Sequence, residues 1–289
     1  MAVEVRHVLI VLSLVGSNLA SSVNRTTVNK RASKILWQLD NFPNSDPLKY
    51  FKPHDDGFYN KGSLSTFADP EDPHRDVIRV FYQKGTYSSI QGYYGAQFYS
   101  RPISEQTSLT FSYQLYFSPG FDFVRGGKLP GLAGGEEATC SGGRHSETCF
   151  SARLMWRREG DGEIYAYLPE QVDDFCERPD AICSPTIKGT SLGRSDFRWR
   201  TGVWMKVSEH VTLNDVGKDN GIAKLWIDDK LVYSGHNIRW RVRDDVKISS
   251  VFFSTFFGGN TPEWAATDNC YTYFKEFILS TGDQPPVAG

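Results

Sequence analysis

The strand expected over residues 150–157 presents two arginines on one face, where they could hold an acidic ligand. Its apolar and polar side chains alternate with the two-residue period of a strand. The polar set includes Ser151, Arg153 and Arg157, and we expect this set to face solvent. Guanidinium groups bind carboxylates through paired N–H donors, so the face is suited to recognising an acid.

A second strand, expected over residues 163–168, adds two tyrosines to the same face. Tyr165 and Tyr167 alternate there with apolar side chains. A Gly-Asp-Gly turn signal between the two strands predicts a hairpin, so the tyrosines would lie beside Ser151 and Arg153. Taken alone, this pattern is also compatible with an ordinary solvated sheet face on which arginine and tyrosine side chains pack across strands.

A lysine between glycines precedes these strands. Residues 125–132 read Arg-Gly-Gly-Lys-Leu-Pro-Gly-Leu, and we expect them to form a loop. The glycines would let the backbone approach a ligand closely, and Pro130 would stiffen the loop that carries Lys128. The segment lacks the spacing of a phosphate-binding loop and does not open a helix. Without its neighbours, Lys128 would be interpreted as a surface lysine.

The three segments, in this order and spacing, closely resemble the polysaccharide lyase family 14 alginate lyases, especially the secreted digestive enzymes of herbivorous marine molluscs. The resemblance runs from about Trp37 to Leu279 and includes the loop between Cys140 and Cys149. It implies a β-jelly roll whose concave sheet forms a cleft for an acidic polysaccharide. It also implies cleavage by β-elimination, for which we expect no cofactor.

The resemblance assigns roles to individual residues. The catalytic residues that it implies are Lys128, Ser151, Arg153, Tyr165 and Tyr167. The residues that we expect to bind substrate beside them are Gln97, Arg125 and Arg157.

β-Elimination in a 4-linked uronate removes the proton at C5 and expels the oxygen at C4. The C5 proton is a poor acid until the neighbouring carboxylate is neutralised or hydrogen-bonded, so the site must supply donors there. Arg153 could hold that carboxylate with its fork of N–H groups, and Ser151 could add one more donor.

The base and the acid are not fixed by the sequence. In mannuronate the C5 proton and O4 lie on the same side, so one tyrosine could serve as base and then as acid. Tyr165 or Tyr167 would need nearby cations to lower its pKa from about 10, with Lys128 stabilising the enolate-like intermediate. The exchanged assignment, in which a neutral Lys128 is the base, stays open.

Other functions lack comparable support. No Glu-x-Asp-x-x-Glu signature for glycoside hydrolysis and no His-Glu-x-x-His motif occurs. We expect no metal dependence, because arginine and lysine can neutralise the substrate carboxylate. A non-catalytic carbohydrate-binding jelly roll is the main alternative from another class. Within the enzymes, the alternative is a lyase acting on glucuronan or another polyuronate.

The elements that must position these residues are strands. Apolar alternation between turn signals predicts further strands over residues 77–82, 108–117, 204–213, 221–227, 230–233, 248–257 and 271–279. Asp228 and Asp229 would join two of them in a tight hairpin. No repeat, no linker and no long helical period is visible. The chain, with 26 Gly and 14 Pro, is therefore predicted to be an all-β, two-sheet antiparallel sandwich of jelly-roll type.

The N-terminus has the layout of a secretory signal peptide. Arg6 precedes an apolar run over residues 8–15, and small residues follow. We expect a signal peptide over residues 1–22, a secreted protein, and one domain over residues 23–289. The apolar run is shorter than the ~20 residues of a membrane span, so we expect no membrane attachment. Asn24 begins a glycosylation sequon.

Five cysteines fit an oxidising compartment. The simplest disulfide pairing closes two short loops, Cys140 with Cys149 and Cys176 with Cys183, and leaves Cys270 free. Sequence alone does not fix this connectivity. A zinc site is the competing interpretation, but neither spacing resembles Cys-x-x-Cys and no histidine pair accompanies them.

The charge balance limits the partners. With 32 basic and 34 acidic side chains, the net charge of −2 excludes a generally basic nucleic-acid binder. A polyanion must therefore meet a local basic patch. We expect no nucleic-acid partner, an acidic polysaccharide such as alginate as the substrate, and a monomer.

Overall fold

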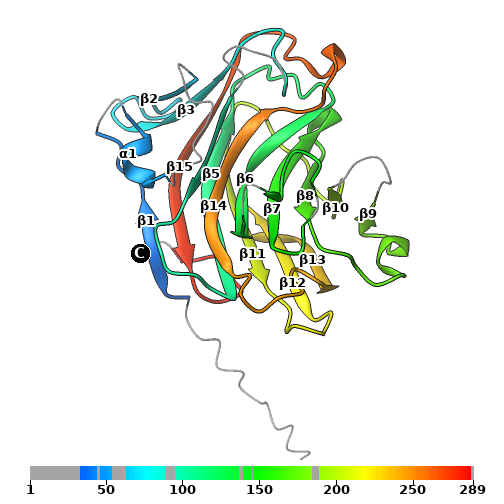
Figure 1. Ribbon diagram of the computed structural model, residues 1–289. Coiled ribbons are helices and arrows are strands. Elements are labelled where there is room, and N and C mark those ends of the chain that lie inside the picture. The colour runs from blue at the N-terminus through cyan, green and yellow to red at the C-terminus, as the bar shows by residue number, and fades with distance from the viewer. Residues whose placement is uncertain are drawn as a thin grey trace, which may run out of the picture. The chain divides into compact units, whose positions relative to one another are not determined.

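Strands dominate the computed structural model, which describes residues 33–43, 46–53, 63–88, 95–136, 139–144, 146–183 and 189–287. The strands form an eight-stranded and a seven-stranded sheet, both antiparallel. Figure 1 shows the two sheets facing each other as the layers of a sandwich. The predicted all-β, two-sheet fold is confirmed. The expected signal peptide and the Asn24 sequon lie outside the described residues.

The eight-stranded sheet has the order β13-β12-β11-β5-β15-β3-β2, and β1 pairs with β15 beside this path. Its strands are β1 (Ile35–Leu39), β2 (Leu64–Ala68), β3 (Asp76–Tyr82), β5 (Ser108–Phe117), β11 (Trp204–Thr212), β12 (Gly221–Ile227), β13 (Lys230–Ile238) and β15 (Cys270–Ser280).

The seven-stranded sheet has the order β4-β14-β6-β7-β8-β10-β9, which puts β6 and β7 at its centre. Its strands are β4 (Ala96–Ser100), β6 (Gly126–Gly135), β7 (Cys149–Arg157), β8 (Gly162–Tyr167), β9 (Ala181–Ile182), β10 (Thr190–Leu192) and β14 (Ile248–Phe257). The helical turns are short: α1 (Leu48–Phe51), η2 (Arg158–Gly160), η3 (Phe175–Glu177) and η4 (Pro262–Trp264). Within the part of the chain that the structure describes, no helix is long and apolar enough to cross a membrane.

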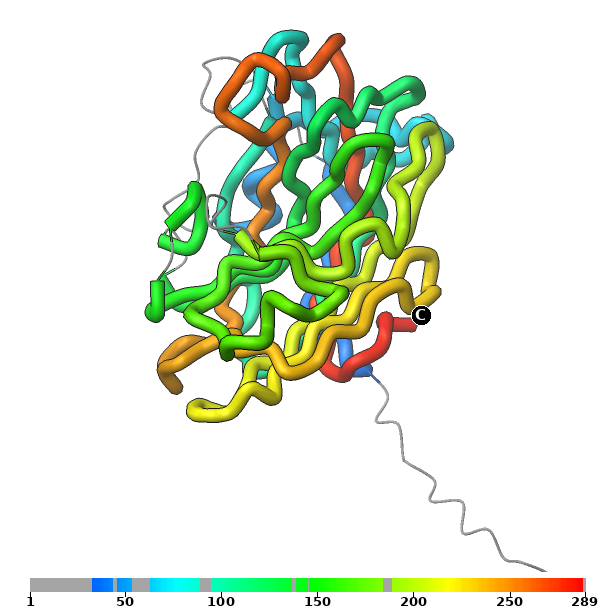
Figure 2. The backbone as a smooth tube through the Cα atoms, turned by 90° about the vertical axis from the view of Figure 1, so that its right-hand side faces the viewer, coloured from blue at the N-terminus to red at the C-terminus, as the bar shows by residue number. Residues whose placement is uncertain are grey.

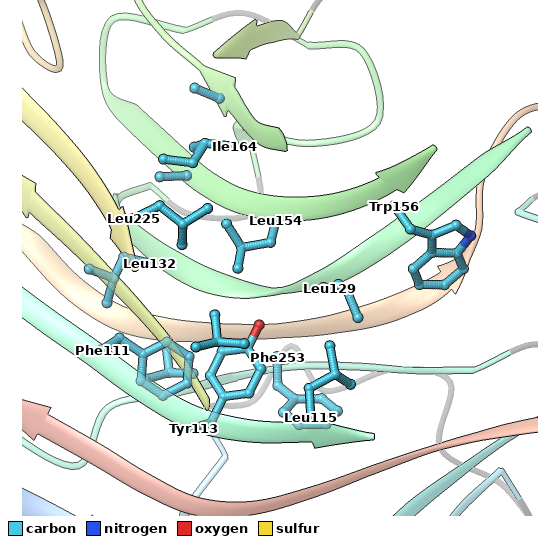
Figure 3. Packing of buried hydrophobic residues seen from close by; sticks show 14 of the residues in the cluster. Phe111, Tyr113, Leu115, Leu129, Leu132, Leu154, Trp156, Ile164, Leu225 and Phe253 are labelled. Atoms are coloured by element: carbon cyan, nitrogen blue, oxygen red, sulfur yellow. The ribbon is translucent and has the colours of Figure 1, made fainter. Parts of the chain in front are cut away.

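The core lies between the sheets and follows the two-residue period of the strands. On β5, every second residue from Leu109 to Phe117 is buried, as predicted. Aromatic rings fill much of the space, and Trp156 of β7 packs edge-on against Phe117 and Phe257. Figure 3 shows side chains of both sheets meeting in this layer. The face of the seven-stranded sheet that points away from this core, called the outer face below, carries the predicted site residues.

Residues 125–132 are not a loop, so that prediction is wrong. Most of them belong to β6, a central strand hydrogen-bonded to β7 and β14. Pro130 is tolerated because the register with β7 shifts between Leu129 and Gly131, which forms a bulge at the proline. A Cβ on Gly131 would lie 2.0 Å from the carbonyl oxygen of Ala152. The glycine is thus needed for the close approach of two strands.

The other predicted strands are present, with ends that move by a few residues. Asp228 and Asp229 form the predicted tight turn, and both have positive φ angles, 50° and 61°. Strands β1, β2, β4, β9 and β10 were not predicted, because they are short and their alternation is weak. The predicted pairing of the cysteines is confirmed: disulfides join Cys140 with Cys149 and Cys176 with Cys183, and Cys270 is free and buried.

One end of the sandwich is closed by the segment that follows β8. Figure 2 shows this green segment beside the yellow hairpin of β12 and β13. The hydroxyl of Tyr233 on β13 donates a hydrogen bond to Asp180 at 3.0 Å, and Arg178 donates to the carbonyl oxygen of His236 at 2.6 Å. These contacts tie the outermost strands of the two sheets together.

We expect Phe253→Ala to lower the free energy of unfolding by about 3–5 kcal/mol, the range for a buried aromatic truncated in a well-packed core. Phe253 is fully buried and its ring lies 4.8 Å from that of Phe98 and 5.1 Å from that of Phe274. Phe67→Ala is the matched control, since Phe67 is 45% exposed and should lose only about 1 kcal/mol with its cation–π contact. Chemical denaturation measures both, and equal losses would contradict this description of the core.

Candidate active site

Three neighbouring strands bring the predicted catalytic residues together. In the register of β7 with β8, Ser151 lies opposite Tyr167 and Arg153 opposite Tyr165. In the register of β6 with β7, Lys128 lies opposite Met155, two residues beyond Arg153. Since side chains directly opposite each other share a face, the outer face gathers a group that we call the Lys128 cluster. Its members are Lys128, Ser151, Arg153, Met155, Tyr165 and Tyr167.

The expectation that this face is exposed to solvent is wrong for most of the cluster. Ser151 is fully buried, Arg153 is 1% exposed, and the two tyrosines are 5% and 4% exposed. One cause is the loop closed by the Cys140–Cys149 disulfide. The Ser151 hydroxyl donates to the carbonyl oxygen of Cys140 at 2.8 Å, and the amide of Gly143 donates to the Tyr167 hydroxyl oxygen at 3.0 Å. The Ser151 hydrogen therefore holds the loop instead of pointing at the site.

Lys128 lies in surroundings that disfavour its charge. Its Nζ is 3.9 Å from the centre of the Tyr165 ring and 2.8 Å from Sδ of Met155, a weak acceptor. Burial, followed by the charges of Arg153 and Arg157, lowers the pKa of Lys128 well below its ordinary value. The side chain is thus prepared to act as a neutral amine.

Arg153 carries a buried charge without an ion pair to any described residue. Its Nη1 donates to Oγ of Ser254 at 3.1 Å, and Ser254 donates in turn to Oε1 of Gln97 at 3.0 Å. Its guanidinium lies 4.4 Å from the centre of the Phe252 ring, and its buried Nε has no hydrogen-bond partner among the described residues. Burial lowers the pKa of Arg153. A guanidinium held in this way has donors left for an anionic ligand.

Tyr165 and Tyr167 form an edge-to-face pair, with ring centres 5.6 Å apart. Burial is the largest influence on Tyr165 and raises its pKa, to which the neighbouring Tyr167 adds. The charges of Arg157 and Arg153 act in the opposite direction but do not reverse the shift. The hypothesis that cations make this tyrosine more acidic therefore does not hold for Tyr165, which keeps its proton.

Arg157 is committed to an internal ion pair. Its Nε and Nη2 both contact Oε1 of the fully buried Glu163, at 2.8 and 2.6 Å. Arg194, from the turn after β10, contacts the other carboxylate oxygen at 2.5 Å. Two cations thus compensate one buried carboxylate, which keeps Arg157 5.6 Å from the centre of the Tyr165 ring.

The remaining predicted binding residues lie at different distances from the cluster. Gln97, 9% exposed on β4, joins it through Ser254. Arg125 precedes β6 beyond the end of the cluster, and its charge contributes to lowering the pKa of Glu263. Sequence reasoning gave Met155 no role, although the strand alternation put it on the same face as Arg153, and it missed Glu163, Arg194 and Ser254. Glu163 could have been found from the sequence, because it is two residues before Tyr165 in the strand and therefore lies on the same face.

The sequence also contains a Gly-x-Ser-x-Gly pattern, but its serine is not placed as a catalytic nucleophile would be. Residues 189–193 read Gly-Thr-Ser-Leu-Gly, the spacing found at the nucleophile of many serine hydrolases. That nucleophile requires a sharp turn from a strand into a helix, whereas Ser191 lies within β10 and no helix follows. Its hydroxyl accepts a hydrogen bond from Arg194 at 2.6 Å. Among the residues that the structure describes, no three metal-ligating side chains are grouped as a metal site would require.

Comparison with known proteins identifies the family of this chain. The family model for polysaccharide lyase 14 matches residues 70–277, which include every strand from β4 to β14. The chain belongs to the polysaccharide lyase 14 family. The resemblance stated from the three sequence segments is thereby confirmed.

Solved structures and one curated protein are similar to this chain. The PL-14 alginate lyase of Aplysia kurodai is 38% identical, with a TM-score of 0.79, and the match covers 87% of this chain and 100% of that one. Alginate lyase vAL-1 from Chlorella virus shares the fold, at 24% identity, a TM-score of 0.66, and coverage of 86% and 100%. Exolysin of Paramecium bursaria Chlorella virus 1 is 25% identical over 201 residues, which are 62% of this lyase-family chain and only 30% of Exolysin.

The lowered pKa of Lys128 predicts that Lys128→Met stabilises the protein. The unfolded chain, in which the pKa returns to about 10.5, binds more protons than the folded one, so the lysine disfavours folding below that pH. The gain should be largest at low pH and shrink as the pH rises toward 10.5. Chemical denaturation at several pH values measures it.

Lys224→Met is the control for that prediction. Lys224, on β12 of the eight-stranded sheet, is also largely buried, with 17% exposure, but it pairs with Asp283, which follows β15. Its replacement should not stabilise the protein. A Lys128→Met protein that is no more stable than the wild type at neutral pH would mean that the amine is not disfavoured in the folded state.

Proposed function

We propose that this protein is a secreted, monomeric lyase that cleaves mannuronate-rich alginate by β-elimination. The observation that carries the proposal is the Lys128 cluster. In it, the buried Arg153, which forms no ion pair with any described residue, lies near Lys128, an amine of lowered pKa. The alginate lyase activity of the Aplysia kurodai relative, 38% identical over most of the chain, supports alginate as the substrate. Within the part described, both predicted disulfides form, which fits an oxidising compartment and supports secretion.

Arg153 would bind the carboxylate of the uronate at the cleavage point. Its charge is desolvated, and its hydrogen bonds to described residues are limited to Ser254, so an entering carboxylate supplies the missing counter-charge. Holding the carboxylate with two N–H donors makes the adjacent C5 proton more acidic, because the negative charge that develops on deprotonation is stabilised.

Lys128 would be the base. As a neutral amine it accepts the C5 proton; the C–H electrons form the C4–C5 double bond, and the C4–O4 bond breaks. Tyr165, whose pKa burial raises, retains a proton that it can donate to the departing O4. The amine lies 3.9 Å from the Tyr165 ring, so base and acid approach the sugar from one side. This suits mannuronate, in which the C5 proton and O4 are on the same side.

The substrate is tested by incubating the protein separately with mannuronate-rich alginate, guluronate-rich alginate and glucuronan, and following the ultraviolet absorbance of the unsaturated product. We expect the largest rise with the mannuronate-rich polymer. A rise only with glucuronan would keep the mechanism and overturn the substrate. A folded protein that is silent on all three polymers but retained by an alginate column would instead be a carbohydrate-binding protein.

The base is tested by Lys128→Ala, which should lower kcat about 100- to 10,000-fold, the usual contribution of a general base. Added small primary amines should restore part of the rate in this variant, because they can replace the missing base. Tyr165→Phe should be equally impaired and should not respond to amines. Rescue of Tyr165→Phe alone, or nearly normal rates in Lys128→Ala, would contradict the assignment.

A further inference from the structure

The lysine of the cluster faces outward only because β6 contains a bulge at Pro130. Leu132, farther along the same strand, is fully buried in the core. In a regular strand, residues four apart lie on the same face, so Lys128 would also point into the core. The register with β7 shifts by one residue between Leu129 and Gly131, and this shift reverses the alternation.

Two polar side chains of the opposite sheet reach this bulge. Tyr113 on β5 donates its hydroxyl hydrogen to the carbonyl oxygen of Pro130 at 3.1 Å. Figure 3 shows the Tyr113 hydroxyl directed across the core toward the other sheet. The amide of Leu132 donates to Oε2 of Glu209 on β11 at 3.2 Å. Both bonds therefore end on the backbone of β6, on either side of Gly131.

Glu209 interrupts an apolar stripe. Along β11 it lies on the same face as the core residues Met205, Val207 and Val211, and it is itself fully buried. Burial raises the pKa of Glu209 well above its usual range, which favours the uncharged acid. Its second oxygen has no hydrogen-bond partner among the described residues. Leucine would pack there at lower cost, which points to a role for the oxygen that accepts from Leu132.

We propose that Tyr113 and Glu209 are positioning residues for Lys128. From the opposite sheet, they hydrogen-bond to one carbonyl and one amide of the bulged backbone of β6, an arrangement that we call the clamp. The clamp fixes the lysine on the outer face. The inference rests on the proposed function, in which Lys128 is the base. Both residues act through the backbone, since they lie in the core on the other side of the seven-stranded sheet.

Three substitutions test the clamp. Tyr113→Phe and Glu209→Leu each remove one hydrogen bond at nearly constant volume, whereas Glu209→Gln keeps an oxygen that accepts from Leu132. In the first two we expect kcat on alginate to fall about 10- to 100-fold with KM nearly unchanged, as for a misplaced catalytic group. The acidic limb of the pH profile of kcat/KM should move to higher pH, because Lys128 becomes less buried and leaves the neighbourhood of Arg153 and Arg157. Glu209→Gln should restore both properties.

Tyr233→Phe is the matched control. Its hydroxyl donates to Asp180, away from β6, so the variant should lose stability as Tyr113→Phe does while kcat and the pH profile stay those of the wild type. Should Glu209→Leu fail to fold, Tyr113→Phe and Tyr233→Phe decide the question. A folded Tyr113→Phe with wild-type kinetics, or a Glu209→Gln as impaired as Glu209→Leu, would overturn the proposal.

A second readout does not require activity. Acetic anhydride acylates neutral amines, and mass spectrometry of the peptide that contains Lys128 gives the pH at which labelling is half-maximal. We expect this pH to be lower than for other lysines in the wild type and to rise in Tyr113→Phe. A protein inactive on every polyuronate would still give this result, so failure of the proposed function and failure of the clamp are distinguishable. An unchanged labelling profile in Tyr113→Phe would contradict the clamp.

Discussion

The buried guanidinium of Arg153 is the feature on which the chemistry of the outer face depends. A charge that is 1% exposed and has no ion pair with a described residue is unfavourable unless a ligand completes it. The same charge, after burial itself, lowers the pKa of the nearby amine of Lys128. Arg153 therefore leaves the outer face able to take an anion and, after burial and together with Arg157, lowers the pKa of the amine beside it.

The surrounding charges show why Arg153 is the one left available. Arg157 is four residues along the same strand and lies on the same face. Its charge is neutralised by Glu163, which Arg194 also contacts. Because these groups project from strands with a fixed register, their spacing is set by the hydrogen bonds of the sheet. The Cys140–Cys149 loop completes the arrangement by accepting from Ser151 and donating to Tyr167. Rigid placement of this kind keeps Lys128, Tyr165 and Arg153 in one geometry.

Much of this could be predicted from the sequence where one physical rule decided the outcome. The two-residue period placed Arg153 and Tyr165 on one face, and their cross-strand pairing followed from the turn between the strands. The rule failed at Pro130, because a glycine-rich segment with proline is typical of a loop unless tertiary contacts hold it in a sheet. Burial of the outer face could not be predicted either, since it comes from a loop that is close in space and irregular in sequence.

The central claim is that Lys128 is uncharged in the folded protein near neutral pH. Reductive methylation with carbon-13 formaldehyde gives each lysine a resonance, and loss of one resonance in Lys128→Ala assigns it. The account predicts that this resonance titrates well below those of the other lysines, and that Arg153→Met raises its pKa. Titration together with the surface lysines, near the ordinary value of 10.5, would contradict it.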